Sequence, residues 1–267
     1  MKATPTTRIF AFALAVIFMG AGFLRHTSAD AATVQKKGWV LDQYTDQFGL
    51  VKVYLSADGV RAEGKSGLIM VSRGPDWNVV AFSPAVKKFA VCKLNQFYGM
   101  SINRLATLTR GNLSALELVP GKHGTAYGVK TADYESTKTF ERAQMTRFRL
   151  KEIHPSQAFH VNYTVADSLA VPNKEGEVMA RYFGIPATAG VPLSFKFSRV
   201  GGGDIDLVTV RSLQSKMLSP SMFAVPSGYA QIASIDNLLA QSASGVGGMD
   251  LIFGGMDRKA GFGLDDK

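Results

Sequence analysis

Six short extended segments follow one another between residues 39 and 92, with only brief turns between them. Asp58-Gly59 supplies the positive φ that a tight hairpin needs, and Pro75 and Pro84 fix φ in two further turns. The gaps are too short for crossover helices, so neighbouring segments are expected to pair antiparallel. The expected strands cover residues 39–46, 50–56, 60–65, 68–72, 77–82 and 87–92. The domain is therefore predicted to begin as an antiparallel meander.

Beyond residue 92 the chain adds more strands and two short helices. Apolar residues at helical spacing predict one helix over residues 102–109 and another over 174–183. The second helix has an apolar stripe made of Val178, Met179, Tyr182 and Phe183. Further strands are expected over residues 116–119, 125–133, 142–153, 161–170, 192–200 and 205–213, with hairpin loops at 121–124 and 201–204. Few helices and many short strands predict a mainly β protein.

The first 31 residues have the features of a signal peptide. Lys2 and Arg8 precede an apolar run over residues 9–24, which is shorter than the roughly 20 residues of a spanning helix. Ala29-Asp30-Ala31 fits a cleavage site. Cys92 is the only Cys, so neither a lipid-modified Cys at that site nor an internal disulfide is expected. The mature protein is predicted to be periplasmic or secreted; an uncleaved anchor is the alternative.

The amino-acid composition limits the classes of binding partner and indicates a C-terminal tail. Cleavage after residue 31 leaves 27 basic and 20 acidic residues, a formal net charge of +7. A basic exported protein suits peripheral contact with an anionic membrane surface or an acidic polymer. No basic-aromatic motif is present, so no nucleic-acid partner is predicted. Residues 233–267 are rich in Gly and Ser and are expected to form a flexible tail, with one helical turn at 236–241.

One nucleotide-binding pattern matches the sequence. Residues 59–66 read GVRAEGKS, which fits a P-loop, but a P-loop must leave a strand and open a helix. Residues 68–72 have the pattern of another strand, so this stretch is predicted to be part of a hairpin and no nucleotide is expected. The four His residues lack a second ligand at metal spacing, and no Gly-x-Ser-x-Gly elbow occurs. No metal, cofactor or catalytic residue is predicted.

Three separated motifs together resemble a known family. The first is Val53-Tyr54-Leu55-Ser56-x-Asp58-Gly59-Val60-Arg61-x-Glu63, followed by Trp77-Asn78-Val79-Val80 and Pro84-x-x-Lys87-Lys88-Phe89. The second is Gly190-Val191-Pro192-Leu193, and the third is Met222-Phe223-x-Val225-Pro226-x-Gly228-Tyr229. In this order they are similar to the LolA-like superfamily of outer-membrane lipoprotein-sorting proteins, and the likeness spans residues 38–232.

The resemblance implies an incomplete antiparallel β-barrel (a half-barrel) over residues 32–232, with short α-helices covering an apolar concave face. Carriers of this type shelter acyl chains there, and an Arg on an early strand tethers the lid; Arg61 is the matching residue. Residues 96–109 and 174–183 are the lid candidates.

These observations give a functional hypothesis. The chain is expected to be a non-enzymatic carrier that binds a lipid or lipidated protein and takes part in transport to the outer membrane. The side chains expected to line its cavity are Val53, Leu55, Ile69, Val71, Trp77, Phe82, Leu193, Phe195 and Phe197. A filled core at these positions is the structural alternative. A sensor or scaffold module on the same fold and an exported hydrolase with a loop-built site are the alternative functions.

Overall fold

The computed structural model describes residues 34–46, 48–65, 67–97, 113–136, 159–169, 173–199 and 204–245. The chain divides into two units, Met1–Ala32 and Thr33–Lys267, and every described residue belongs to the second. The expected signal peptide, the helix over residues 102–109, the strand over 142–153 and most of the tail lie outside the described residues.

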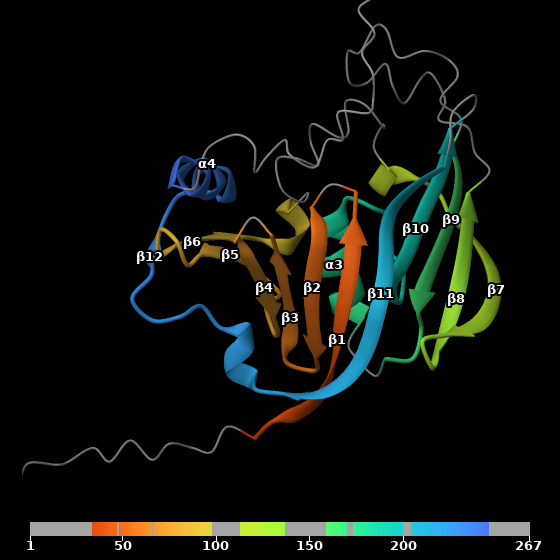
Figure 1. Ribbon diagram of the computed structural model, residues 1–267, viewed down its shortest axis with the longest axis horizontal. Helices are drawn as coiled ribbons and strands as arrows, with labels where there is room; N and C mark the ends of the chain where they lie inside the picture. Colours follow the sequence, from red (N-terminus) through yellow and green to blue (C-terminus); the bar gives the residue numbers. More distant parts are fainter. Residues whose placement is uncertain are drawn as a thin grey trace, which may run out of the picture. The chain divides into compact units, whose positions relative to one another are not determined.

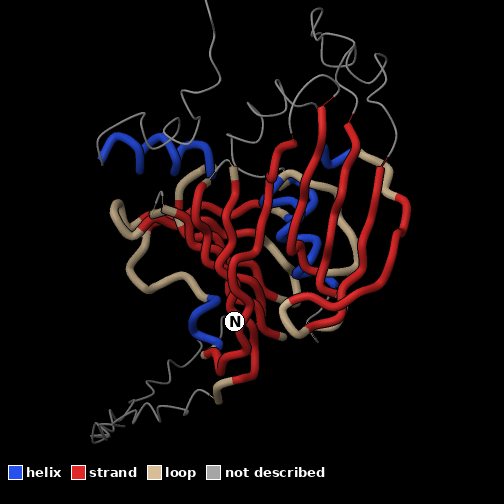
Figure 2. Tube along the Cα trace, turned by 45° about the vertical axis from the view of Figure 1, so that its right-hand side comes forward, coloured by secondary structure: helices blue, strands red, loops and turns tan. Residues whose placement is uncertain are grey.

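The described strands form a single sheet that curls around a helix (Figures 1 and 2). The strands are β1 Lys36–Thr45, β2 Gly49–Ser56, β3 Gly59–Gly64, β4 Ile69–Arg73, β5 Val79–Ser83, β6 Lys88–Cys92, β7 Val119–Ala126, β8 Val129–Ser136, β9 Phe159–Ala166, β10 Val191–Arg199, β11 Asp204–Leu218 and β12 Ala230–Gln231. Their order is β12-β6-β5-β4-β3-β2-β1-β11-β10-β9-β8-β7. Only the β12–β6 pair among these is parallel. The sheet does not close, so the predicted mainly β, incomplete antiparallel barrel is confirmed.

Two meanders meet at the centre of the sheet. Strands β1 to β6 step outward one after another, and β7 to β11 return until β11 pairs with β1. The six expected strands of the first meander are all present, within a few residues at their ends. β3 is followed by β4 rather than by a helix, so the hairpin interpretation of the P-loop pattern is also confirmed.

The predicted hairpin loop at residues 121–124 is wrong. β7 runs through these residues with a bulge between Pro120 and His123, and the turn lies at Tyr127-Gly128. A Gly inside a strand often marks a bulge rather than a turn. Tyr127 has a φ of +54°, which costs a non-Gly residue about 1–2 kcal/mol. Its hydroxyl donates to the Val210 carbonyl at 2.6 Å, which offsets part of that cost.

Two helices pack on the sheet. α3 (Asn173–Phe183) lies on the inner, concave face and contacts β10 and β3, as predicted for a covering helix. Its predicted apolar stripe is buried. α4 (Ile235–Gly245) replaces the single turn expected in the tail and packs on β5 and β6 through Leu238, which is fully buried. Neither helix has the length and mean hydropathy of a membrane span.

Short 3₁₀ helices complete the described elements: η1 Leu94–Gln96, η2 Leu113–Ala115 and η3 Pro220–Phe223. Residues 219–231, which include η3, form a C-terminal strap that crosses the outer face of the sheet and ends as β12 beside β6. Beneath the strap, Phe223 packs with Val40 and Leu218 in a small second core. The strap therefore covers the outer face over β3 and β4, while Tyr44, Leu50 and Val91 of that face stay exposed.

Candidate ligand-binding site

Five of the nine predicted cavity residues lie together on the inner face. Val53 and Leu55 of β2 and Leu193, Phe195 and Phe197 of β10 belong to the main hydrophobic core, each at most 2% exposed. α3 packs directly over this region. Trp77, which precedes β5, is half-buried against the same core. In the described structure these six side chains therefore pack within or against a filled core.

The other three predicted cavity residues point away from that core. Ile69 pairs with Phe82, and Val71 pairs with Val80, across β4 and β5. Their strand neighbours Met70 and Ala81 belong to the inner core, and successive side chains of a strand alternate between faces. Ile69, Val71 and Phe82 therefore lie on the outer face, where Phe82 meets Tyr229 of the strap edge-on at 5.8 Å.

Arg61 also lies on the outer face. Its guanidinium donates to the Met222 carbonyl at 2.9 Å and to Glu63 at 2.5 Å, and it stands 5.6 Å from the ring centre of Phe82. The resemblance assigned Arg61 to a lid over the concave face. Its described contacts are instead with the C-terminal strap on the opposite side of the sheet.

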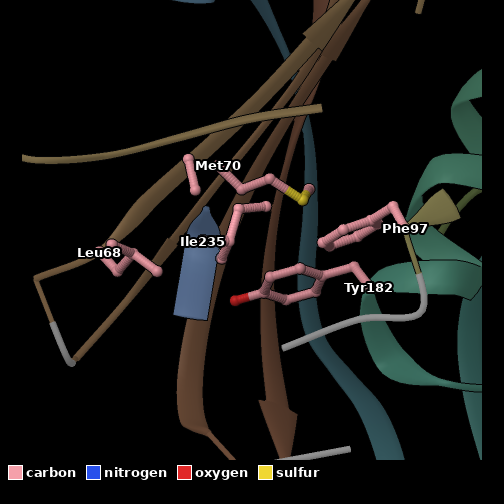
Figure 3. A pocket seen from close by; sticks show the side chains of 6 residues that line it. Leu68, Met70, Phe97, Tyr182 and Ile235 are labelled. Carbon is pink, nitrogen blue, oxygen red and sulfur yellow. The ribbon is translucent and has the colours of Figure 1, made fainter. Parts of the chain in front are cut away.

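The described structure contains an apolar pocket at the rim of the inner face (Figure 3). The sheet supplies Met70 and Ala81, which are cross-strand neighbours on β4 and β5. The other lining side chains come from the segment before β4, the end of η1, the last turn of α3 and the first turn of α4. They are Leu68, Phe97, Tyr182 and Ile235. In Figure 3 the side chains of Met70, Phe97, Tyr182 and Ile235 converge on one space.

The pocket is small and its walls carry almost no polar surface. The space open to the centre of a water-sized sphere is about 10 Å³, roughly the room for one water molecule. Tyr182 is 3% exposed and packs against Phe48 and Phe183, with ring centres 5.3 and 5.2 Å away. Burial raises the pKa of its hydroxyl above the ordinary tyrosine value, so the phenol stays neutral. Such walls favour an apolar occupant.

α4 forms one wall of the pocket and packs on β5 and β6. Ser234 caps its N-terminus through a 3.1 Å hydrogen bond from the Asn237 amide. Leu238 enters the core, and Ile235 and Leu239 pack against it. Lys88 of β6 donates to the Gln241 side chain at 2.8 Å. Moving this helix would join the pocket to the apolar surface beneath it.

The described ranges include two of the four histidines of the chain. They contain no group of three or more His, Cys, Asp or Glu side chains that could hold a metal ion. His123 is exposed on β7, 3.6 Å from the Asp167 carboxylate, and His160 is exposed on β9. Both lie on strands far along the sheet from β4 and β5.

None of the nine residues predicted for the cavity lines this pocket. Met70 and Ala81 are the strand neighbours of Val71 and Phe82, so they lie on the opposite face of the sheet. This alternation is the sequence signal that could have identified them. In β4 and β5 both faces are apolar because the strap covers the outer one, so the sequence alone did not distinguish the two sets. Leu68, Phe97 and Ile235 lie outside strands, and tertiary packing alone brings them to the site.

Comparison with known proteins gives only remote likenesses. No protein-family model and no curated protein match the chain. Among solved structures, PNGF-II aligns with a TM-score of 0.42 and 10% identity, over 78% of this chain and 33% of that one. The present chain therefore spans about a third of the length of PNGF-II. A putative outer-membrane lipoprotein-sorting protein domain from Vibrio parahaemolyticus aligns at 0.25 and 9% identity, over 67% and 85% of the two chains. A LolA superfamily protein from Nitrosomonas europaea aligns at 0.24 and 12% identity, over 72% and 91%. At these TM-scores the likenesses assign neither a family nor an activity to the chain.

Proposed function

We propose that this protein is an exported, non-enzymatic carrier of the cell envelope that holds an acyl chain of a lipid or lipidated protein between the sheet, α3 and α4. The observation that supports this function most directly is the pocket. Its lining comes from β4, β5, α3, α4, the end of η1 and the segment before β4, and it is almost entirely apolar. Export rests on the pattern of residues 1–31 and remains a prediction.

Binding an acyl chain requires the pocket to widen, because its present space suits about one water molecule. We take α4 as the wall that moves, because it packs mainly on the neighbouring strands β5 and β6 near one edge of the sheet, whereas α3 packs on β3 and β10 from both meanders. Burying one methylene contributes about 0.8 kcal/mol, so ten methylenes contribute about 8 kcal/mol before the cost of displacing α4. That gain requires no specific polar contact, which fits a carrier of lipids that share only their chains.

A larger side chain on the sheet, pointing into the pocket, tests this function. Ala81→Leu adds three carbons to a residue that is 2% exposed and lines the pocket. We expect this variant to bind a fluorescent fatty-acyl probe at least tenfold more weakly than the wild type, with a Tm within a few degrees of it. Ala132→Leu is the matched control, because Ala132 is a buried alanine of the inner face on β8, away from the pocket.

Two results would count against the carrier function. One is wild-type protein that, after delipidation, never takes up the acyl probe. The other is equal loss of binding in the Ala81 and Ala132 variants, which would place the probe elsewhere. A stoichiometric protein partner captured by crosslinking, without bound lipid, would favour the sensor alternative instead.

A further inference from the structure

The C-terminal end of the described chain contacts both faces of the sheet and passes around its edge at β6. Tyr229, just before β12, packs on Phe82 of the outer face, with ring centres 5.8 Å apart. Ile232, just after β12, packs against the inner core. β12 itself lies beside β6, and α4 follows it (Figure 1). Residues 229–245 therefore enclose the edge of the sheet, and we call them the C-terminal clip.

The two sides of the clip are close together in the sequence. Tyr229 and Ile232 are three positions apart, and an extended chain covers at most about 3.6 Å per position. The backbone between them is fastened to the edge, because the Ala230 amide donates to the Lys87 carbonyl at 3.0 Å. The Ile232 amide likewise donates to the Phe89 carbonyl at 2.8 Å. This connection has no spare length that would let one side move far while the other stays.

α4 is joined to the edge as closely. Ser234 caps the helix, so only Ala233 separates the cap from the Ile232 hydrogen bond. Lys88 lies on β6, the strand with which β12 pairs, and its side chain reaches Gln241 of α4 at 2.8 Å. Backbone and side chain both link the helix to β12 and β6.

A turn that does not pack on the sheet precedes the clip. Phe223 is 1% exposed in the second core and fixes the chain on the outer face upstream of this turn. Pro226, Ser227 and Gly228 are all exposed. Gly228 has a φ of +81°, and the place that its Cβ atom would take is open space. Such a turn can absorb backbone rotation while the core contacts on its two sides stay intact.

We propose that the C-terminal clip opens as one unit about residues 224–228, so that Tyr229 leaves the outer face and α4 leaves the inner face together. The pocket beneath α4 is then controlled from the opposite side of the sheet, because a partner that displaces Tyr229 from Phe82 opens it. The consequence for acyl binding rests on the proposed function, whereas the coupling of the two faces is measured without a lipid.

Hydrogen exchange in Tyr229→Ala tests this coupling. The substitution removes the ring that packs on Phe82 and leaves the sequence of α4 unchanged. The amides of Ala230 and Ile232 report on the edge, and the Leu238 amide reports on the helix. Because a cooperative unit opens as a whole, exchange at all three should accelerate by the same factor, on the order of tenfold. Acceleration at the edge with an unchanged rate at Leu238 would refute the proposal.

Tyr127→Ala is the matched control. Tyr127 is a half-exposed tyrosine in the turn between β7 and β8, at the other end of the strand order. Its replacement should leave exchange at Leu238 at the wild-type rate. Equal acceleration at Leu238 in both variants would trace the effect to unfolding of the whole domain, and the clip would then not be a unit of its own.

A reversible disulfide tests the same coupling in the opposite direction. Gln231 and Phe89 are Cα partners on β12 and β6, at a spacing that a disulfide can bridge. We use Gln231→Cys with Phe89→Cys, and Cys92→Ser to remove the free thiol. The oxidised protein should exchange the Leu238 amide at least tenfold more slowly than the reduced protein. Equal rates in the two redox states would contradict the proposal.

The same disulfide variant separates the clip from the carrier function. If the reduced protein takes up a fluorescent fatty-acyl probe and the oxidised protein takes it up far more slowly, both proposals are supported. If oxidation slows exchange at Leu238 but neither redox state takes up the probe, the clip stands and the carrier function fails. If both states take up the probe at the same rate, the clip does not control the pocket.

Discussion

Arg61 connects the sheet to the C-terminal strap. Its guanidinium reaches Glu63 on its own strand, the Met222 carbonyl of η3 and the ring of Phe82, which in turn meets Tyr229. The side chain is 17% exposed, so these interactions are largely shielded from water. A single residue near the start of the domain thus holds a segment about 160 positions later.

Replacing Arg61 by Met keeps the length of the side chain and removes its donors. A lost hydrogen bond from a charged group costs about 1.5–3 kcal/mol, so we expect the free energy of unfolding in urea to fall by about 2 kcal/mol. The strap should also loosen, which hydrogen exchange can detect at the amides of Ala230 and Ile232, which donate to the carbonyls of Lys87 and Phe89. Arg73→Met, at an exposed arginine of β4, is the control. Equal losses in both variants would show that Arg61 does not hold the strap.

At the scale of elements, the local sequence predicted where the strands lie better than it predicted which of their side chains face the inner core. Asp-Gly and Gly turns placed the meander, and strict alternation placed β10, because these signals are local. In β4 the sequence Ile69-Met70-Val71 is apolar throughout, so its pattern does not show which side chains point inward. The outer side chains are apolar because the strap covers them, and the strap follows about 150 residues later in the sequence. The pocket was missed for the same reason, since α4 and η1 reach it only in the folded chain. The Gly-rich composition after residue 233 concealed α4, whose burial comes mainly from Leu238.

α4 is predicted to close the pocket, and a pair of truncations tests this. Ending the chain after residue 234 removes α4, exposes Met70 and Ala81, and should raise the fluorescence of an apolar dye several-fold. Ending it after residue 245 retains the helix and should leave the fluorescence at the wild-type level. Loss of Leu238 and its neighbours should cost about 2–5 kcal/mol in urea unfolding, the range for emptying a buried leucine site. Similar dye binding by the two truncated proteins would show that α4 does not close the pocket.

At the scale of the whole molecule, positive charge gathers at the end of the sheet where β1 begins and β11 ends. β1 begins beside the end of β11 (Figure 1). Its pairing with β2 starts at Gly38, so Lys36 and Lys37 pair only with Leu218 and Met217 of β11. Met217 is 58% exposed, and Lys37 and Lys216 beside it are exposed as well. Met217 and its cross-strand partner Lys37 share one face, whereas Lys216 lies on the other face of β11. An exposed apolar side chain next to a lysine suits the interface of an anionic bilayer.

We therefore expect this end of the sheet to contact anionic membranes. Each lysine near such a surface contributes about 1 kcal/mol, so Lys37→Gln with Lys216→Gln should weaken binding to phosphatidylglycerol-containing vesicles about 30-fold in a sedimentation assay. Added salt should weaken wild-type binding, because screening shortens the reach of the attraction. Lys122→Gln with Lys130→Gln makes the same charge change on exposed positions of β7 and β8 and should leave binding almost unaltered. If both pairs weaken binding equally, the attraction comes from net charge and not from this end of the sheet, and a carrier that docks through β1 and β11 is ruled out.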